Sequence, residues 1–300
     1  MKQAESFDVV IIGGSYSGLA AALALGRAVR SVLVVDSGKP CNAQTPHSHN
    51  FLTQDGNTPA AIANLAREQV LQYPTITFIE DKVVDAQGSD LNFTVELGAG
   101  EFIQAKKLLF TTGIKDLFPA IKGLAQCWGI SVIHCPYCHG YEYRDQPTGI
   151  LINGEGALEM ARLISNWTKD LTIFTNGAST ITEEDQTKIS ALGIEIVVDE
   201  LAEIMHENGY LNCSMLKNGQ RKNLTALYAR LPFEQHCTVP EEMGCEMTDK
   251  GYIQVNGFQQ TSVPGVYAAG DNTTMMRSLT AAVSSGTMAG VSINRDLIFN

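Results

Sequence analysis

Two cysteines three positions apart, Cys135 and Cys138, are the residues best suited to chemistry in this 300-residue chain. They lie in the segment HCPYCHG, residues 134–140. Pro136 fits the first turn of a helix, where its missing N–H costs nothing, so both sulfurs should lie on one face and be able to form a disulfide. A helix N-terminus and a neighbouring imidazole favour the thiolate of Cys135, which is the form that attacks a disulfide. His139 follows the pair and could carry a proton to or from the leaving thiolate.

Two other interpretations of this pair are weaker. A zinc site needs four ligands, and the chain offers no second ligand pair at a useful spacing, so we expect no metal. A buried structural pair of cysteines would need no chemistry at all. The other five cysteines are scattered along a chain without a secretion signal, which argues against a disulfide framework. A redox-active dithiol is therefore the favoured interpretation.

A glycine-rich turn opens the chain between two apolar strands. Residues 8–12 and 31–36 have β-strand character, residues 19–28 are helical in composition, and GGSYSG lies between them. Gly13 would permit the tight turn and Gly18 the close helix–strand contact, whereas Ser15 replaces the middle glycine of the dinucleotide pattern. Asp36 ends the second strand, where a carboxylate can accept hydrogen bonds from ribose hydroxyls. The alternative is a glycine-rich turn without a ligand, which this placement makes less favoured.

A second strand–turn–helix–strand unit follows over residues 149–175, with Gly154 and Gly156 in its turn. We predict an α/β fold of two Rossmann-like, three-layer (ββα) dinucleotide-binding domains, the second inserted into the first. The first domain would comprise residues 1–114 and 246–300. The second, residues 115–245, would carry the CxxC pair.

The charge balance excludes several classes of partner. The chain has 21 basic and 32 acidic residues, a net charge of −11, and no basic cluster, so we expect no binding to nucleic acid or to an anionic membrane. No apolar run approaches the roughly 20 residues of a membrane span, and no signal peptide is visible. We expect a cytoplasmic protein.

Two later segments carry a family resemblance. LFTTG, residues 109–113, resembles the Ala-Thr-Gly motif of flavoproteins with two dinucleotide domains, and PGVYAAGD, residues 264–271, resembles their second FAD fingerprint. Together with the internal CxxC, their order resembles low-molecular-weight thioredoxin reductase over essentially the whole chain. The resemblance implies an FAD cofactor. The residues it assigns to that cofactor are Gly13, Gly14, Ser15, Gly18, Asp36, Asn50, Val83, Thr112, Gly113, Gly270, Asp271, Arg277, Ser278 and Leu279.

The resemblance also assigns roles to the dithiol. It implies that Cys138 exchanges electrons with the flavin and that Cys135 is the interchange thiol for the substrate. Thioredoxin reductases have an aspartic acid directly after the second cysteine, whereas this chain has His139. In this respect the motif is more like the related oxidases that close dithiols in metabolites such as gliotoxin and holomycin. The family further implies a homodimer, with a hinge near residues 114–117 and 245–248.

The second glycine turn lacks features of an NADPH site. In NADPH-dependent members the turn is Gly-x-Gly-x-x-Ala, and a His-Arg-Arg after the next strand binds the 2′-phosphate. Here Ile152 replaces the first glycine, Glu155 puts a carboxylate in the turn, and the next strand ends at Asn176 without an arginine. NADPH binding should be weak or absent, and NADH, which needs no such arginine, stays open.

Several functions therefore remain. A thiol oxidase would take electrons from a small dithiol and pass them through FAD to oxygen. A reductase would use electrons from NAD(P)H, or from a separate donor such as ferredoxin, to reduce a thioredoxin-like protein. A flavin redox sensor without turnover is a third alternative. The roles of Cys41, His47 and His49, in the loop after the second strand, stay open between inert loop residues and positions near the flavin or substrate.

Overall fold

The computed structural model describes residues 5–299, which form two compact units. The first unit contains residues 5–43, Pro59–Lys115 and residues 233–299; the second contains Gln44–Thr58 and Asp116–Pro232. The second unit thus interrupts the first, as the strand order of the sequence indicates. The chain crosses between the units at Lys115/Asp116 and Pro232/Phe233, and the loop Gln44–Thr58 also packs with the second unit.

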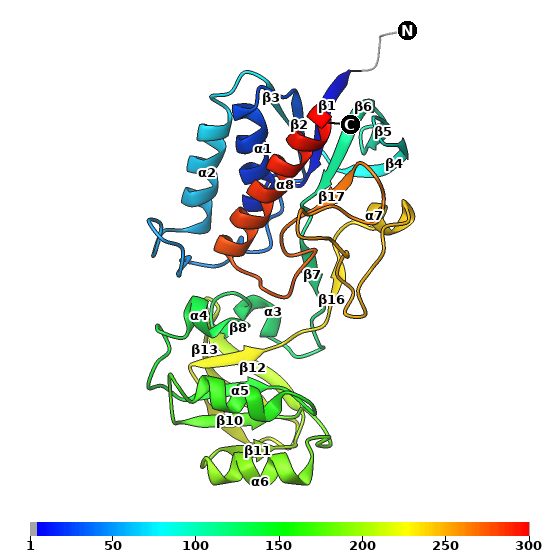
Figure 1. The fold of residues 1–300 in the computed structure, drawn as a ribbon. Helices are drawn as coiled ribbons and strands as arrows, with labels where there is room; N and C mark the ends of the chain where they lie inside the picture. Colours follow the sequence, from blue (N-terminus) through cyan, green and yellow to red (C-terminus); the bar gives the residue numbers. More distant parts are fainter. Residues whose placement is uncertain (1–4, 300) are drawn as a thin grey trace. The chain divides into compact units, whose positions relative to one another are not determined.

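The first unit is built on a mainly parallel sheet of order β3-β2-β1-β6-β5-β4, with β17 paired to β6 (Figure 1). Its strands are β1 (Ser6–Ile12), β2 (Val32–Asp36), β3 (Ile76–Glu80), β4 (Val83–Ser89), β5 (Asn92–Leu97), β6 (Phe102–Phe110) and β17 (Val266–Ala268). Strands β3, β2, β1, β6 and β17 are parallel, so their carboxyl ends meet at one edge. The glycine turn after β1 and the segment after β6 are thereby brought together.

Strand β6 runs without a break from Phe102 to Phe110. Its first half pairs antiparallel with β5, for example Ala105 with Phe93, while β1 lies along its other side, where Val9 pairs with Lys107. Lys107 does not break the strand because its fully buried ammonium is paired with Asp90 at 2.6 Å and with Asp296 at 2.5 Å. A buried charge is tolerated only with such partners.

Apolar layers cover both faces of this sheet. The helices α1 (Tyr16–Arg27), α2 (Pro59–Val70) and α8 (Leu279–Phe299) form one layer (Figure 1). Leu25 of α1 belongs to the same buried cluster as the strand residues Val9 and Ile11. The β4–β5 hairpin encloses the other core with Phe93 and Val95. Gly286 lets α8 pack closely on α1, because a Cβ there would collide with the backbone of Ser17.

The second unit is also layered. Its parallel sheet has the order β11-β10-β9-β15-β8, with helices on one face and the antiparallel sheet β12-β13-β14 on the other. Its strands are β8 (Val132–Ile133), β9 (Thr148–Leu151), β10 (Leu171–Phe174), β11 (Glu195–Val197), β12 (Leu201–Glu207), β13 (Tyr210–Leu216), β14 (Arg221–Asn223) and β15 (Ala226–Ala229). Its helices are α3 (Leu124–Cys127), α4 (Pro136–His139), α5 (Ala157–Ile164) and α6 (Glu183–Ala191). The predicted α/β class and Rossmann-like layers are confirmed.

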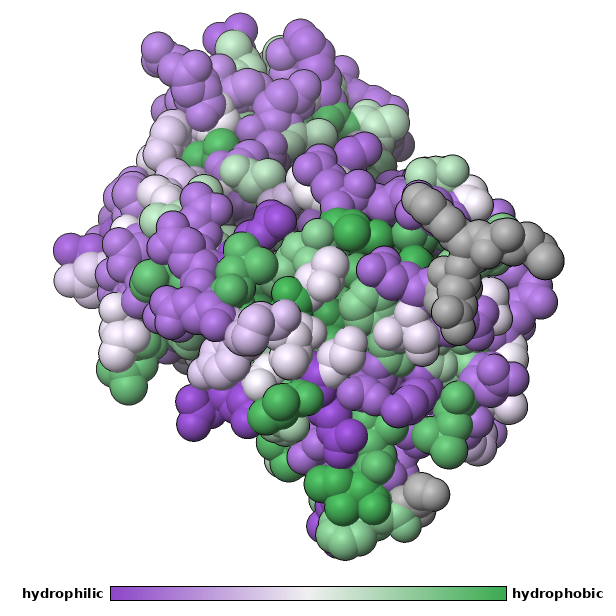
Figure 2. Space-filling model, turned by 90° about the horizontal axis from the view of Figure 1, so that it is seen from above, coloured by the Kyte–Doolittle hydropathy of each residue, from purple (hydrophilic) through white to green (hydrophobic). Residues whose placement is uncertain are grey.

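The remaining elements are short. Strands β7 (Ile114–Asp116) and β16 (Phe233–Gln235) pair where the chain crosses between the units, and α7 (Val239–Glu242) follows. No helix within residues 5–299 combines the length and the apolar character that a membrane span requires. On the face that Figure 2 shows, hydrophilic residues predominate and hydrophobic ones gather in small groups.

Candidate active site

The first glycine turn is shaped by contacts with the strand end beside it. Gly13 has a φ of 106°, and a Cβ there would collide with the backbone oxygen of Thr111. The Thr111 hydroxyl donates to the Gly13 carbonyl at 2.6 Å. A Cβ at Gly18 would in turn collide with that carbonyl. Both glycines thus serve the tight turn and the close packing that the dinucleotide pattern requires.

Asp36 lies beside this turn at the end of β2. Its carboxylate accepts hydrogen bonds from the backbone N–H of Gly14 and, at 2.7 Å, from that of Gly38. Each carboxylate oxygen keeps a further lone pair for a ribose hydroxyl. Ser15 stands at the N-cap of α1 but its side chain makes no capping bond, which leaves the first amides of the helix directed toward an anion.

Buried polar atoms next to the turn support a bound group. Within residues 5–299, the side-chain oxygens Ser17 Oγ, Thr112 Oγ1 and Asn272 Oδ1 are buried and have no hydrogen-bond partner. All three belong to the first unit. Buried polar atoms are nearly always paired, so this set fits a ligand that supplies donors and acceptors. Gly113, with φ 66°, has open space beside its Cα and leaves room for that ligand.

Ser17 and Asn272 were missed by the sequence analysis. Asn272 is fully buried and its amide nitrogen donates to the Phe110 carbonyl at 2.9 Å. Its position directly after Asp271 in the second fingerprint was the available signal. Ser17 lies within the glycine turn itself, where the glycines and Ser15 were considered but Ser17 was not.

The segment that leads into α8 holds the last predicted residues. Gly270 has a φ of 93°, which disfavours a side chain. The Arg277 guanidinium lies 3.8 Å from the Asp271 carboxylate. Ser278 accepts a hydrogen bond at 3.2 Å from an amide in the first turn of α8, so it caps the helix that begins at Leu279.

Asn50 and Val83 lie in different units. Val83 is buried as the first residue of β4 in the first unit. Asn50 lies in the loop that packs with the second unit, where its backbone N–H donates to Asp55 at 2.7 Å. The cofactor roles of both residues stay predictions.

The second glycine turn is held by its own side chains. Asn153 Oδ1 accepts hydrogen bonds from the backbone and the hydroxyl of Thr180, at 2.7 and 3.1 Å, and Asn153 Nδ2 donates to Ala178 at 2.9 Å. A Cβ at Gly154 would lie 2.8 Å from the Thr180 hydroxyl. The Asn153 side chain therefore ties the end of β9 to the loop after β10.

Two charged residues flank this turn. Glu155 is exposed within it. Arg230, at the end of β15, has its guanidinium 3.8 Å from where a Cβ of Gly156 would stand. The sequence analysis missed this cation because it comes 74 positions after the turn. Asn176 stands where NADPH-dependent members have an arginine. Its side chain accepts a hydrogen bond from the Leu201 N–H at 2.8 Å.

The dithiol is closed as a disulfide in the second unit. Cys135 and Cys138 are bonded, with their Cα atoms 5.3 Å apart. Cys135 is the N-cap of the short helix α4, and Pro136 is its first residue, as the spacing predicts. A Cβ at Gly140 would come within 3.0 Å of Trp167 and Tyr228, so the end of α4 packs tightly.

His139 lies at the end of α4 and is largely enclosed. Burial lowers its pKa to about 4, the nearby Glu142 carboxylate opposes this shift, and His49 adds to it. The imidazole is therefore neutral at neutral pH, with a free lone pair, and its burial favours rapid loss of any proton that it accepts. The edge of its ring meets His49 at a centroid distance of 6.5 Å. His134, before the pair, stacks on Trp128 at 5.9 Å.

The other cysteines differ from this pair. Cys127 and Cys245 are buried, and burial raises the pKa of both thiols, as it does for the partly buried Cys237. Raised pKa values keep these sulfurs protonated and unreactive. Cys41 is exposed.

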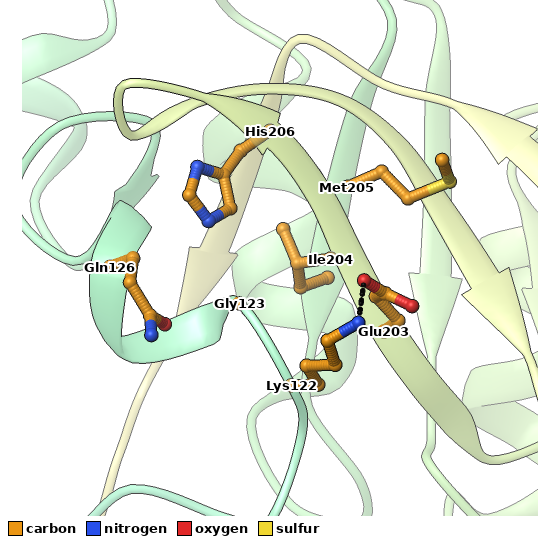
Figure 3. Close-up of a pocket in the computed structure, with 7 residues that line it drawn as sticks. All are labelled: Lys122, Gly123, Gln126, Glu203, Ile204, Met205 and His206. Carbon is orange, nitrogen blue, oxygen red and sulfur yellow. Dashed lines mark ion pairs between the residues drawn. The ribbon is translucent and has the colours of Figure 1, made fainter.

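A pocket of about 230 Å³ in the second unit holds none of the predicted residues (Figure 3). It is lined by Lys122, Gly123, Gln126, Glu203, Ile204, Met205 and His206. Lys122 and Glu203 are paired at 2.7 Å, so their charges already offset each other.

Comparison with known proteins agrees with this geometry. Residues 7–286 match the family model described as pyridine nucleotide-disulphide oxidoreductase. The chain is 32% identical to the thioredoxin reductase tcpT of Claviceps purpurea, over 99% of this chain and 96% of that protein. It is 31% identical to the thioredoxin reductase sirT of Leptosphaeria maculans, over 96% and 93%.

Among solved structures, an oxidoreductase from Agrobacterium tumefaciens superposes with a TM-score of 0.91 at 36% identity, over 98% of this chain and 99% of that one. Both the sequence relatives and this structure extend over the two units, so the likeness is not confined to one dinucleotide turn. The chain therefore belongs to the pyridine nucleotide-disulphide oxidoreductase family and is a thioredoxin-reductase-like FAD-dependent disulfide oxidoreductase.

Proposed function

We propose that this enzyme oxidises dithiols through Cys135 and Cys138 without using NADPH. The observation that carries the proposal is the state of the second turn. Ile152 and Asn176 stand where the family has a glycine and an arginine, and the side chains of Asn153 and Asn176 are engaged in internal hydrogen bonds. The dithiol in the same unit is intact.

The exchange step uses the protein's own disulfide as oxidant. A substrate thiol gives its proton to His139, and the thiolate attacks Cys135, forming a mixed disulfide while Cys138 leaves as a thiolate. After His139 has released the first proton, the second substrate thiol gives its proton to His139. Its thiolate attacks the substrate sulfur of the mixed disulfide, and Cys135 leaves as a thiolate. The substrate ends as a disulfide, and the electron pair resides on the two cysteines.

The first unit would hold FAD. The amides of the first turn would face the pyrophosphate, Asp36 a ribose, and Thr112 and Asn272 would gain the partners their buried oxygens lack. When bound, FAD supplies a two-electron acceptor that molecular oxygen can reoxidise.

The substrate class follows from the relatives and from the surface beside the dithiol. Relatives named as thioredoxin reductases suggest a disulfide or dithiol partner of the thioredoxin type or a small dithiol. Tyr137, between the cysteines, and Tyr141 are 63% and 66% exposed. Two exposed aromatic rings favour a substrate with apolar or aromatic groups.

The test is an anaerobic stopped-flow experiment on the flavin-loaded protein. Flavin absorbance is followed after mixing with NADPH, with NADH, or with dithiothreitol. Bleaching by the dithiol alone, reversed by air, is the expected result. Rapid bleaching by NADPH would contradict the proposal.

A second candidate, an NAD(P)H-dependent reductase, is favoured by one observation. Arg230 places a cation beside the second turn, where a pyrophosphate would lie in the family. Bleaching by NADH that is lost in Arg230→Ala would establish this candidate. Bleaching by NADH that survives the substitution would remove Arg230 from that role.

A further inference from the structure

The loop Gln44–Thr58 is an ordered element next to the dithiol. It precedes α2 in the chain but packs with the second unit. Its two sides are joined at Ser48, whose N–H donates to the Asn57 carbonyl and whose carbonyl accepts from the Gly56 N–H, both at 2.8 Å. Ser48 is buried, so the loop has a small interior of its own.

The loop is also attached to α3. The Gln44 side chain donates to the carbonyls of Ala125, at 3.1 Å, and of Trp128. Gly129 allows Thr45 to approach, because a Cβ there would lie 2.7 Å from the Thr45 hydroxyl. These contacts determine where the residues at the tip of the loop lie.

His49 is the residue that this loop presents. Its Nε2 lies 3.6 Å from Glu142 Oε1 and its Nδ1 lies 3.7 Å from Asp55 Oδ1. The ring of His139 meets it edge-on at 6.5 Å, and that of His47 lies at 6.4 Å. These four groups are the titratable side chains that face it from the loop and from the segment after α4.

The exchange chemistry requires a route for protons. Oxidation of a dithiol releases two protons in succession, whereas one neutral imidazole, His139, stands after the pair. His139 must release its first proton before it can accept a second. Its enclosure favours prompt release, and the Glu142 carboxylate beside it attracts the proton. The Glu142 side chain is partly open to solvent, at 39% exposure, and lies next to His49, which reaches the more exposed Asp55.

We propose that Glu142 and His49 relay protons from His139 to solvent, an inference that rests on the proposed dithiol chemistry. The proton that His139 takes from a substrate thiol passes to Glu142, then to His49, and leaves near Asp55. The spacings of 3.6 and 3.7 Å exceed a direct hydrogen bond, so a bridging water or a small side-chain rotation completes each transfer. No electrons move in this relay.

The test compares His49→Ala with His47→Ala. His47 is the matched control because it removes an imidazole from the same loop, where Nδ1 contacts the Gly56 carbonyl at 2.9 Å and no carboxylate is engaged. Reduction of the Cys135–Cys138 disulfide by dithiothreitol is followed by acid quench, alkylation and mass spectrometry. This readout reports thiol–disulfide exchange whether or not the flavin is reduced afterwards.

We expect His49→Ala to slow disulfide reduction about 10-fold, and added imidazole to restore much of the rate. Glu142→Gln should slow disulfide reduction by a similar factor. Imidazole should restore little of the rate, because the carboxylate that takes the proton from His139 is missing. His47→Ala should keep the wild-type rate. Equal losses of the reduction rate in the two histidine variants would show that the loop has only a structural role and would overturn the relay. A slow His49→Ala variant whose rate imidazole does not restore would overturn it as well. A wild-type disulfide that is reduced while the flavin stays oxidised would refute the proposed function and leave this comparison intact.

Discussion

The two glycine turns occupy equivalent places in the two units but differ in what surrounds them. At the first turn, the Asp36 carboxylate accepts a hydrogen bond from the Gly14 N–H. The buried side-chain oxygens of Thr112 and Asn272 have no hydrogen-bond partner within residues 5–299 and could bind a ligand. In the second, Asn153 is bonded to the next loop and Glu155 adds a negative charge. The same backbone motif thus has the geometry of a ligand site in the first unit. In the second unit its side chains are engaged with one another, and the chemistry resides in the dithiol.

The largest expected effect comes from removing that dithiol. Cys138→Ser should lower dithiol-dependent flavin reduction by at least about 10³-fold, because no disulfide remains to receive the electron pair. Flavin content should stay unchanged, since the first unit is untouched. Cys41→Ser, at an exposed thiol, is the control. Dithiol bleaching of the Cys138→Ser flavin at the normal rate would show that electrons bypass the second unit.

Matched alanine substitutions compare the two turns directly. Gly18→Ala should weaken FAD binding by about 10- to 100-fold, because its Cβ collides with the Gly13 carbonyl and displaces the turn. Gly156→Ala meets no atom closer than 3.8 Å, and its φ of 84° costs an alanine about 1 kcal/mol in the second unit, but it should keep its flavin because the first turn is unchanged. Flavin-to-protein ratios after gel filtration measure both, with circular dichroism to confirm folding. Equal flavin loss in the two variants would remove the distinction between the turns.

His139 gives the second unit a pH dependence. Its pKa is about 4 in the folded protein against an ordinary 6.5. Between these values the unfolded chain binds a proton that the folded protein does not, so this contribution to stability is complete above pH 6.5 and is lost as the pH falls toward 4. On lowering the pH from about 7 to about 5, the wild type should lose about 2 kcal/mol more than His139→Gln in urea unfolding. Parallel pH profiles would mean that the imidazole titrates normally.

The smallest expected effect concerns the charge in the second turn. Glu155→Gln should strengthen binding of NADPH and NADH alike, by about two- to fivefold, because one exposed carboxylate near a pyrophosphate costs little. Glu159→Gln, at an exposed position in the first turn of α5, is the matched control. Fluorescence titration measures both. A gain of the same size from the control would indicate only a change in net charge.

Local spacing anticipated much of this site. The CxxC with proline at the second position predicted a bridge at the start of a helix, and the structure has both. The glycines of the first turn were predicted from their place between two strands, where φ and close packing leave little choice.

The sequence by itself determined the two strand–turn–helix units, the dithiol and the absence of an arginine after β10, since each depends on residues a few positions apart. The tertiary structure alone decided which groups meet across the chain. It placed Arg230 beside Gly156, left the Thr112 and Asn272 oxygens buried without partners, and set His49 against Glu142. Such pairs depend on the path of the whole chain through sheets and loops, and hydrophobic periodicity and local turn chemistry carry no record of that path.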